Sequence, residues 1–170
     1  MSDENSQYEI YKVIFPIIGA LLSIMGGFGA VIIRSRVEKR DEIEYIKIGL
    51  TDELKEICSI MQKLQETYKT TKIVSNSYLN ELNDNTESYL HHKQRIFLIK
   101  DSDLRRKIAV FYKDLHEQIK DSLNKVGKLG ENPADGAHDP IVQKFNSIQS
   151  KGEEVYNELS KYRYKIFWII

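Results

Sequence analysis

Cysteine and proline are scarce in this 170-residue chain, which contains one cysteine and three prolines. The single cysteine, Cys58, excludes an intrachain disulfide and any zinc site built on several cysteines. An excess of charge is also missing, because 25 basic residues balance 25 acidic ones. Bulk positive charge is what attracts nucleic acid, so this balance predicts that nucleic acid is not a partner.

Recognisable catalytic and cofactor motifs are absent as well. His91 and His92 are adjacent, so on a helix they diverge by about 100° and do not share the face that helical metal sites use. Residues 26–29 (GGFG) lie in an apolar segment without the Lys-Ser/Thr pair of a phosphate loop. No Ser/His/Asp arrangement has a recognisable local context. We therefore expect a protein that is not an enzyme and that binds no cofactor or metal.

One long segment lacks charge altogether. Residues 13–33 (VIFPIIGALLSIMGGFGAVII) contain no ionisable side chain. At about 1.5 Å of rise per residue, a helix of roughly 21 residues spans about 31 Å, which matches the ~30 Å hydrocarbon core of a bilayer. Pro16 falls in the first turn, where its missing N–H removes no intrahelical bond. This pattern predicts a transmembrane helix over 13–33, in preference to a buried helix of a soluble core.

The flanks of this segment predict its orientation. A cleaved signal peptide begins with a basic region, whereas residues 1–12 contain three acidic side chains and a single basic one, Lys12. The residues after the segment include four basic ones: Arg34, Arg36, Lys39 and Arg40. Lys and Arg near a span are retained in the cytoplasm. We therefore predict a single-pass protein of the cell membrane, with the short tail 1–12 outside and the domain 34–170 in the cytoplasm.

Small residues recur every four positions within the predicted span, at Gly19, Ser23 and Gly27. Such spacing lets two membrane helices approach closely, so that van der Waals packing drives their association. The pattern predicts a homo-oligomer formed through this face. The alternative is that glycine is simply common in membrane helices.

The remainder of the chain favours an all-α domain. After residue 34 only Pro133 and Pro140 occur, and no useful length of β-like alternation is present. Four segments have comparable lengths: 40–72, 76–99, 103–127 and 140–168. The apolar seam of the first is Ile43, Ile46, Leu50, Leu54, Ile57, Met61, Leu64 and Tyr68. These steps of three and four, with one stutter near Leu50, predict an antiparallel bundle of three or four helices with coiled-coil-like seams. Pairing between chains is the alternative.

Several helix boundaries follow from side-chain chemistry. Residues 83–86 (NDNT) are the best turn candidate in the second segment, because their side chains compete for backbone hydrogen bonds. Asp101 precedes the next apolar run and predicts a helix start. The polar stretch 130–139 predicts a loop, after which Asp139 is expected as N-cap and Pro140 as the first helical residue.

Three further residues or segments leave alternatives open. The apolar seam of the last segment is Ile141, Phe145, Ile148, Gly152, Val155, Leu159, Tyr162 and Ile166. Gly152 in this seam either permits the close approach of a neighbouring helix or is a tolerated weak spot that costs about 1 kcal/mol of helix propensity. The apolar tail 166–170 is too short to span a bilayer. An even number of cytoplasmic helices would return this tail to the membrane, whereas an odd number would point it away. Cys58 is expected to be a buried, inert thiol.

These patterns together predict a non-enzymatic, membrane-anchored helical protein. Its expected partners are the lipid bilayer, a second copy of the chain and a protein that the sequence does not identify. The alternative is a small signal-transducing component, in which the transmembrane helix couples to the cytoplasmic coiled coil and the stutter near Leu50 transmits a change in helix packing.

Overall fold

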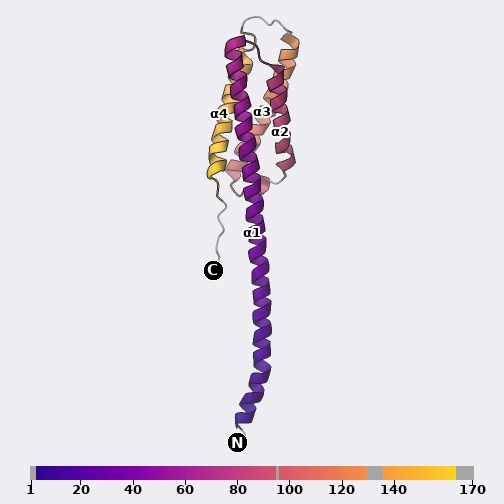
Figure 1. The fold of residues 1–170 in the computed structure, drawn as a ribbon, viewed down its shortest axis with the longest axis vertical. Coiled ribbons are helices and arrows are strands. Elements are labelled where there is room, and N and C mark those ends of the chain that lie inside the picture. The colour runs from indigo at the N-terminus through magenta and orange to yellow at the C-terminus, as the bar shows by residue number, and fades with distance from the viewer. Residues whose placement is uncertain (1–2, 95, 130–135, 164–170) are drawn as a thin grey trace. The chain divides into compact units, whose positions relative to one another are not determined.

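A computed structural model describes residues 3–94, 96–129 and 136–163 of the chain. The described residues form no strand. They form four α-helices and one 3₁₀-helix: α1 (Asp3–Thr71), α2 (Asn76–His92), η1 (Ile96–Leu98), α3 (Ser102–Leu129) and α4 (Asp139–Lys161) (Figure 1). The expected all-α class is therefore correct. The chain divides into two units, Met1–Glu42 and Ile43–Ile170, and α1 contributes residues to both.

The first unit is the N-terminal part of α1. Its apolar side chains are exposed from Phe15 to Ile33, and none of the apolar window that contains them is buried in protein. Among the described residues, this is the one helix that is long and apolar enough to cross a membrane. The core helix of a soluble domain would be covered by other elements, and this segment is not.

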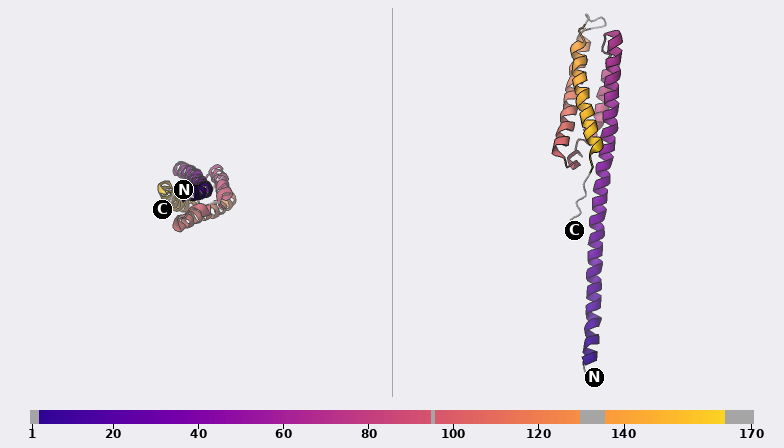
Figure 2. Two further views of the ribbon diagram at one scale, coloured as in Figure 1. Left: turned by 90° about the horizontal axis from the view of Figure 1, so that it is seen from below. Right: turned by 90° about the vertical axis from the view of Figure 1, so that its left-hand side faces the viewer.

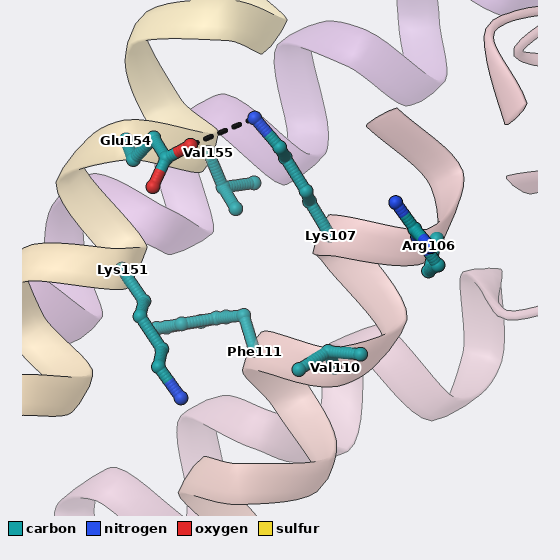
Figure 3. Close-up of a pocket in the computed structure, with 7 residues that line it drawn as sticks. All are labelled: Arg106, Lys107, Val110, Phe111, Lys151, Glu154 and Val155. Atoms are coloured by element: carbon teal, nitrogen blue, oxygen red, sulfur yellow. Dashed lines mark hydrogen bonds and ion pairs between the residues drawn. The ribbon is translucent and has the colours of Figure 1, made fainter. Parts of the chain in front are cut away.

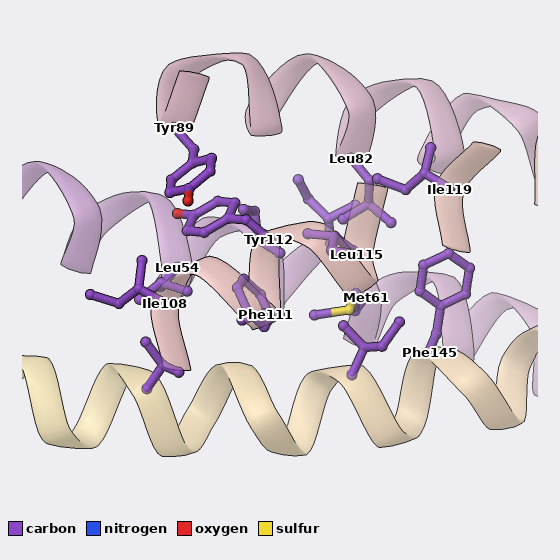
Figure 4. Close-up of a cluster of buried hydrophobic side chains, with 14 of the residues drawn as sticks. Leu54, Met61, Leu82, Tyr89, Ile108, Phe111, Tyr112, Leu115, Ile119 and Phe145 are labelled. Carbon is purple, nitrogen blue, oxygen red and sulfur yellow. The ribbon is translucent and has the colours of Figure 1, made fainter. Parts of the chain in front are cut away.

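The second unit contains a single hydrophobic core to which all four helices contribute. Figures 1 and 2 show the helices from Ile43 onward lying side by side. Every member of the predicted seam of the first segment is buried, from Ile43 to Tyr68. In α4 the expected seam is buried from Ile141 to Leu159, and Val142 is buried in addition. Tyr162 is half-buried, and Ile166 lies outside the described residues. Figure 4 shows how residues of several helices interdigitate in this core.

Contacts between α1 and α4 establish their relative direction within the second unit. Near the end of α1, the Tyr68 hydroxyl donates a hydrogen bond to the Asp139 carboxylate, at the beginning of α4. Closer to Ile43, Cys58 of α1 lies beside Gly152, about halfway along α4. The residue numbers of the contacting pairs fall along α1 as they rise along α4, so the two helices run in opposite directions.

The expected helix start after Asp101 is confirmed. Asp101 Oδ1 accepts hydrogen bonds from the N–H groups of Asp103 and Leu104, both at 3.0 Å. These N–H groups have no intrahelical partner in the first turn, so the carboxylate completes the start of α3. The helix ends at Leu129.

The predicted turn at residues 83–86 is wrong, because these residues lie inside α2. Their polar side chains bond back along the helix: the Asn85 amide donates to the Glu81 carbonyl at 2.9 Å, and the Thr86 hydroxyl donates to the Asn83 carbonyl at 2.7 Å. Burial of an apolar face therefore outweighs the turn tendency of this stretch. The break between α1 and α2 lies between the first two predicted segments, where Lys72 has a φ of +57° and Ser75 caps α2.

The beginning of α4 differs from the prediction by one residue. His138, not Asp139, is the N-cap, and its carbonyl accepts hydrogen bonds from the Ile141 and Val142 N–H groups. Asp139 is already helical, and its carboxylate accepts a hydrogen bond from the Tyr68 hydroxyl instead of capping the helix. Of the predicted loop 130–139, residues 136–138 form a turn, and 130–135 lie outside the described residues. The tail 166–170 also lies outside them.

Candidate functional site

The small residues predicted as an association face lie in the first unit. Gly19, Ser23 and Gly27 are exposed and share one side of α1 by their spacing. A Cβ added at Gly19 or Gly27 would meet no atom of this chain within 4 Å. The face is therefore flat and accessible, as close helix–helix packing requires.

Gly152 is instead a point of close approach inside the second unit. A Cβ built on it would lie 2.7 Å from Cε2 of Phe111 and 3.1 Å from Sγ of Cys58. These neighbours belong to α3 and α1, so three helices meet at this glycine. Of the two alternatives for Gly152, the structure supports close approach.

Cys58, beside Gly152, behaves as expected from its apolar neighbours. Its side chain is half-buried, and burial together with the charge of Glu153 raises the pKa of the thiol to about 11. Thiolate is the nucleophilic form of cysteine, so at neutral pH this residue is inert.

The most unusual chemical feature is a buried carboxyl group that the sequence analysis missed. Glu53 of α1 is 8% exposed. Beside it, the rings of Tyr89 and Tyr112 stack with their centroids 3.8 Å apart and an interplanar angle of 6° (Figure 4). A sequence signal exists: Glu53 is seven residues from both Ile46 and Ile60, which are buried. Residues seven apart share a helix face, so Glu53 belongs to an inward-facing stripe.

The surroundings of Glu53 favour its protonated form. Burial raises the pKa of this carboxyl from 4.5 to about 7, and the nearby charge of Glu56 adds to the effect. The Tyr112 hydroxyl and the Tyr89 backbone lower the pKa by a smaller amount. Within the described part of the chain, Glu53 Oε1 and Tyr112 Oη nevertheless have no well-aligned hydrogen-bond partner. The arrangement is able to take up a proton near neutral pH.

Burial and the charge of Glu53 also raise the pKa of the Tyr112 hydroxyl well above its ordinary value of 10. A cavity of about 410 Å³ borders the two tyrosines, and its lining residues are Thr86, Tyr89, Lys93, Ala109, Tyr112, Lys113 and His116. No group of three or more metal-ligating side chains occurs among the described residues. We identify no nucleophile and base arranged for catalysis among the described residues of this cluster.

A second buried titratable group joins the turn after α1 to the start of α4. His138 is 1% exposed, and its Nδ1 accepts a hydrogen bond from the Val74 N–H at 2.8 Å. Its Nε2 is buried without a partner in the described ranges. Burial lowers the pKa of His138, so the neutral ring that accepts this bond is favoured.

A surface groove of about 400 Å³ separates α3 from α4 (Figure 3). Its apolar lining includes Phe111 and Val155. The two lysines that line it, Lys107 and Lys151, each form an ion pair with an acidic side chain. Lys107 Nζ lies 2.7 Å from Glu154 Oε1, and Lys151 Nζ lies 2.6 Å from Asp114 Oδ2. Side-chain hydrogen bonds with Glu154 and Glu158 raise the Lys107 pKa. We interpret these pairs as links between α3 and α4.

No protein-family model matches this chain, and neither a curated protein nor a solved structure is significantly similar to it. Function is therefore inferred from the chemistry of the residues alone. The features that bear on it are the exposed apolar helix, the charge that follows it and the packed second unit.

Proposed function

We propose that this protein is a non-enzymatic, single-pass membrane protein that presents a cytoplasmic antiparallel helical bundle to a protein partner or to a second copy of itself. The observation that carries the proposal is the uncharged part of α1, whose apolar side chains are exposed from Phe15 to Ile33. Each Val, Ile, Leu or Phe contributes roughly −0.3 to −0.6 kcal/mol to insertion at mid-membrane. About a dozen such residues make insertion favourable by several kcal/mol, without a charge to oppose it.

The second unit supports an interaction role because its core is complete without the first. All buried residues of the core cluster lie between Ile46 and Leu159. A domain that is packed on its own and tethered to a bilayer presents its outer helix faces to other molecules. The accessible face at Gly19, Ser23 and Gly27 supports self-association through the membrane helix.

Membrane extraction and cysteine mapping test both the anchor and its orientation. In a Cys58→Ser background, single cysteines are introduced as Ser6→Cys in the tail and as Ser147→Cys on the exposed side of α4. We expect the protein to resist alkaline carbonate extraction. A membrane-impermeant maleimide should label position 6 in intact cells and position 147 only after permeabilisation. Release by carbonate would refute the anchor, and the opposite labelling would refute the orientation.

A signal-transducing role is the second candidate. The observation that favours it is the unbroken helical assignment of α1 from Asp3 to Thr71, which includes both the apolar segment and the seam. Crosslinking in native membranes separates the two roles. A distinct crosslinked protein supports an interaction role, whereas homodimers whose crosslinks change with a stimulus support signalling.

A further inference from the structure

The chain enters and leaves the second unit at one end. Because α1 and α4 run in opposite directions, Ile43 at the start of this unit and Arg163 after α4 lie at the same end. The 3₁₀-helix η1 is also at this end, since the Lys100 N–H, just after η1, donates to the Tyr162 hydroxyl at 3.0 Å. We call this the η1 end, defined by Ile43, η1 and residues 161–163.

The η1 end displays an aromatic side chain on a rigid support. Phe97 is 67% exposed, whereas Ile96 and Ile99 on either side of it are buried in the core. Arg105 fixes the segment from α3, because its Nη1 donates to the Ile99 carbonyl at 2.5 Å and to the Phe97 carbonyl at 3.4 Å. Phe97 is therefore held outward by the packing of its neighbours.

Basic residues flank η1 along the chain. Lys93 precedes η1 and Lys100 follows it, and both are exposed. An apolar anchor flanked by Lys and Arg is the composition of surfaces that bind an anionic bilayer.

Chain length places the η1 end within reach of a bilayer occupied by residues 13–33. Only nine residues separate Ile33 from Ile43, and the ten Cα–Cα steps between them extend at most about 35 Å. The opposite end of the unit, near Thr71, is about 42 Å from Ile43 along α1. The sequence after Arg163 is YKIFWII, in which Trp168 is of the type enriched at membrane interfaces.

We propose that the η1 end of the second unit binds the anionic cytoplasmic surface of the bilayer, with Phe97 at the level of the lipid headgroups. This inference rests on the proposed membrane anchor. On this inference the bilayer surrounds the transmembrane segment and its surface also binds the helical bundle. The orientation of the bundle then depends on the charge of the lipids.

Lipid quenching in proteoliposomes tests the inference with the full chain. In the Cys58→Ser background, the fluorophore NBD is attached at Gln94→Cys, an exposed position three residues from Phe97. The matched control is Ile73→Cys, an exposed position at the opposite end. Vesicles contain phosphatidylcholine with or without phosphatidylglycerol, and a nitroxide lipid serves as quencher. We expect a loss of emission at position 94 in anionic vesicles, less loss in neutral ones, and none at position 73.

The variant Phe97→Ser, made with the probe at position 94, should weaken this quenching. Unchanged quenching in that variant would overturn the role of Phe97. A probe at 94 that is not quenched in carbonate-resistant proteoliposomes would overturn the inference while the anchor stands. If that probe is shielded from aqueous iodide as well, protein rather than lipid covers the η1 end. Extraction of the protein by carbonate would instead contradict the proposed function itself.

Discussion

At the scale of single residues, Gly152 has no room for a larger side chain. A methyl group there would lie 2.7 Å from Phe111, and Phe111 is itself buried. We expect Gly152→Ala to lower the free energy of unfolding by about 1–3 kcal/mol, as overpacking of a core does. Thermal unfolding followed by circular dichroism measures the effect.

The control is Gly127→Ala, because Gly127 is helical and exposed and its added methyl group meets no atom within 4 Å. Alanine is the better helix former by about 1 kcal/mol, so this variant should be unchanged or more stable. Equal destabilisation by both substitutions would show that close approach at Gly152 is not the reason for the glycine.

The buried carboxyl of Glu53 predicts a loss of stability at alkaline pH. Its pKa is about 7 in the folded chain and 4.5 ordinarily. The folded state therefore holds its proton more tightly, and the associated stability is full below pH 4.5 and is lost as pH rises through 7. We expect Glu53→Gln to be more stable than the parent at pH 8 by roughly 1–3 kcal/mol.

Chemical denaturation across this pH range measures the effect, with Glu81→Gln as control, because Glu81 is exposed and is not among the groups that shift the Glu53 pKa. The control should retain the loss of stability between pH 5 and 8, whereas Glu53→Gln should abolish most of it. A parent protein whose stability is constant over this range would contradict the predicted effect of burying the Glu53 carboxyl.

His138 predicts the opposite pH dependence, in which the free energy of unfolding falls as the solution becomes acidic. Its pKa is lowered below 6.5 by burial, so the unfolded chain binds the proton more readily. The stability from the neutral ring is present above pH 6.5 and is lost as pH falls below it. His138→Gln, which keeps an acceptor for the Val74 N–H, should reduce this acid-side loss in the same denaturation experiment. His116→Gln, at an exposed position, should leave it in place.

At the scale of elements, the apolar part of α1 has a predicted association face. Gly27→Ile places a branched side chain on the face shared with Gly19 and Ser23 and should abolish dimers, because close contact between backbones is lost. A membrane-helix association assay measures this. Gly29→Ile changes a residue about 200° away on the helix and serves as control. Dimers that persist in Gly27→Ile would exclude this face.

The helix boundaries illustrate how local and non-local forces compete. The start of α3 was predictable because Asp101 bonds to N–H groups two and three residues away. Residues 83–86 were mispredicted, since their turn tendency is outweighed by the buried Leu82 and Tyr89 of the same helix. The local sequence does not show that other helices will cover these two side chains in the core.

At the scale of the whole molecule, the core is confined to the second unit. Its buried cluster extends from Ile46 to Leu159, so a fragment without residues 1–42 loses none of it. We expect this fragment to be helical by circular dichroism, to remain in solution without detergent and to unfold cooperatively. A fragment that aggregates or unfolds without a transition would show that the first unit is needed for folding.

The sequence by itself determined the helical class, the uncharged segment 13–33, the seams of α1 and α4 and the cap at Asp101. Each of these depends on residues close together in the chain, whose periodicity or side-chain bonding acts locally. Only the tertiary structure decided that Gly152 is a contact point, that Glu53 and His138 are buried and that Phe97 is displayed beside the chain's entry and exit. Those properties depend on which helices lie opposite one another, and packing between distant segments sets them.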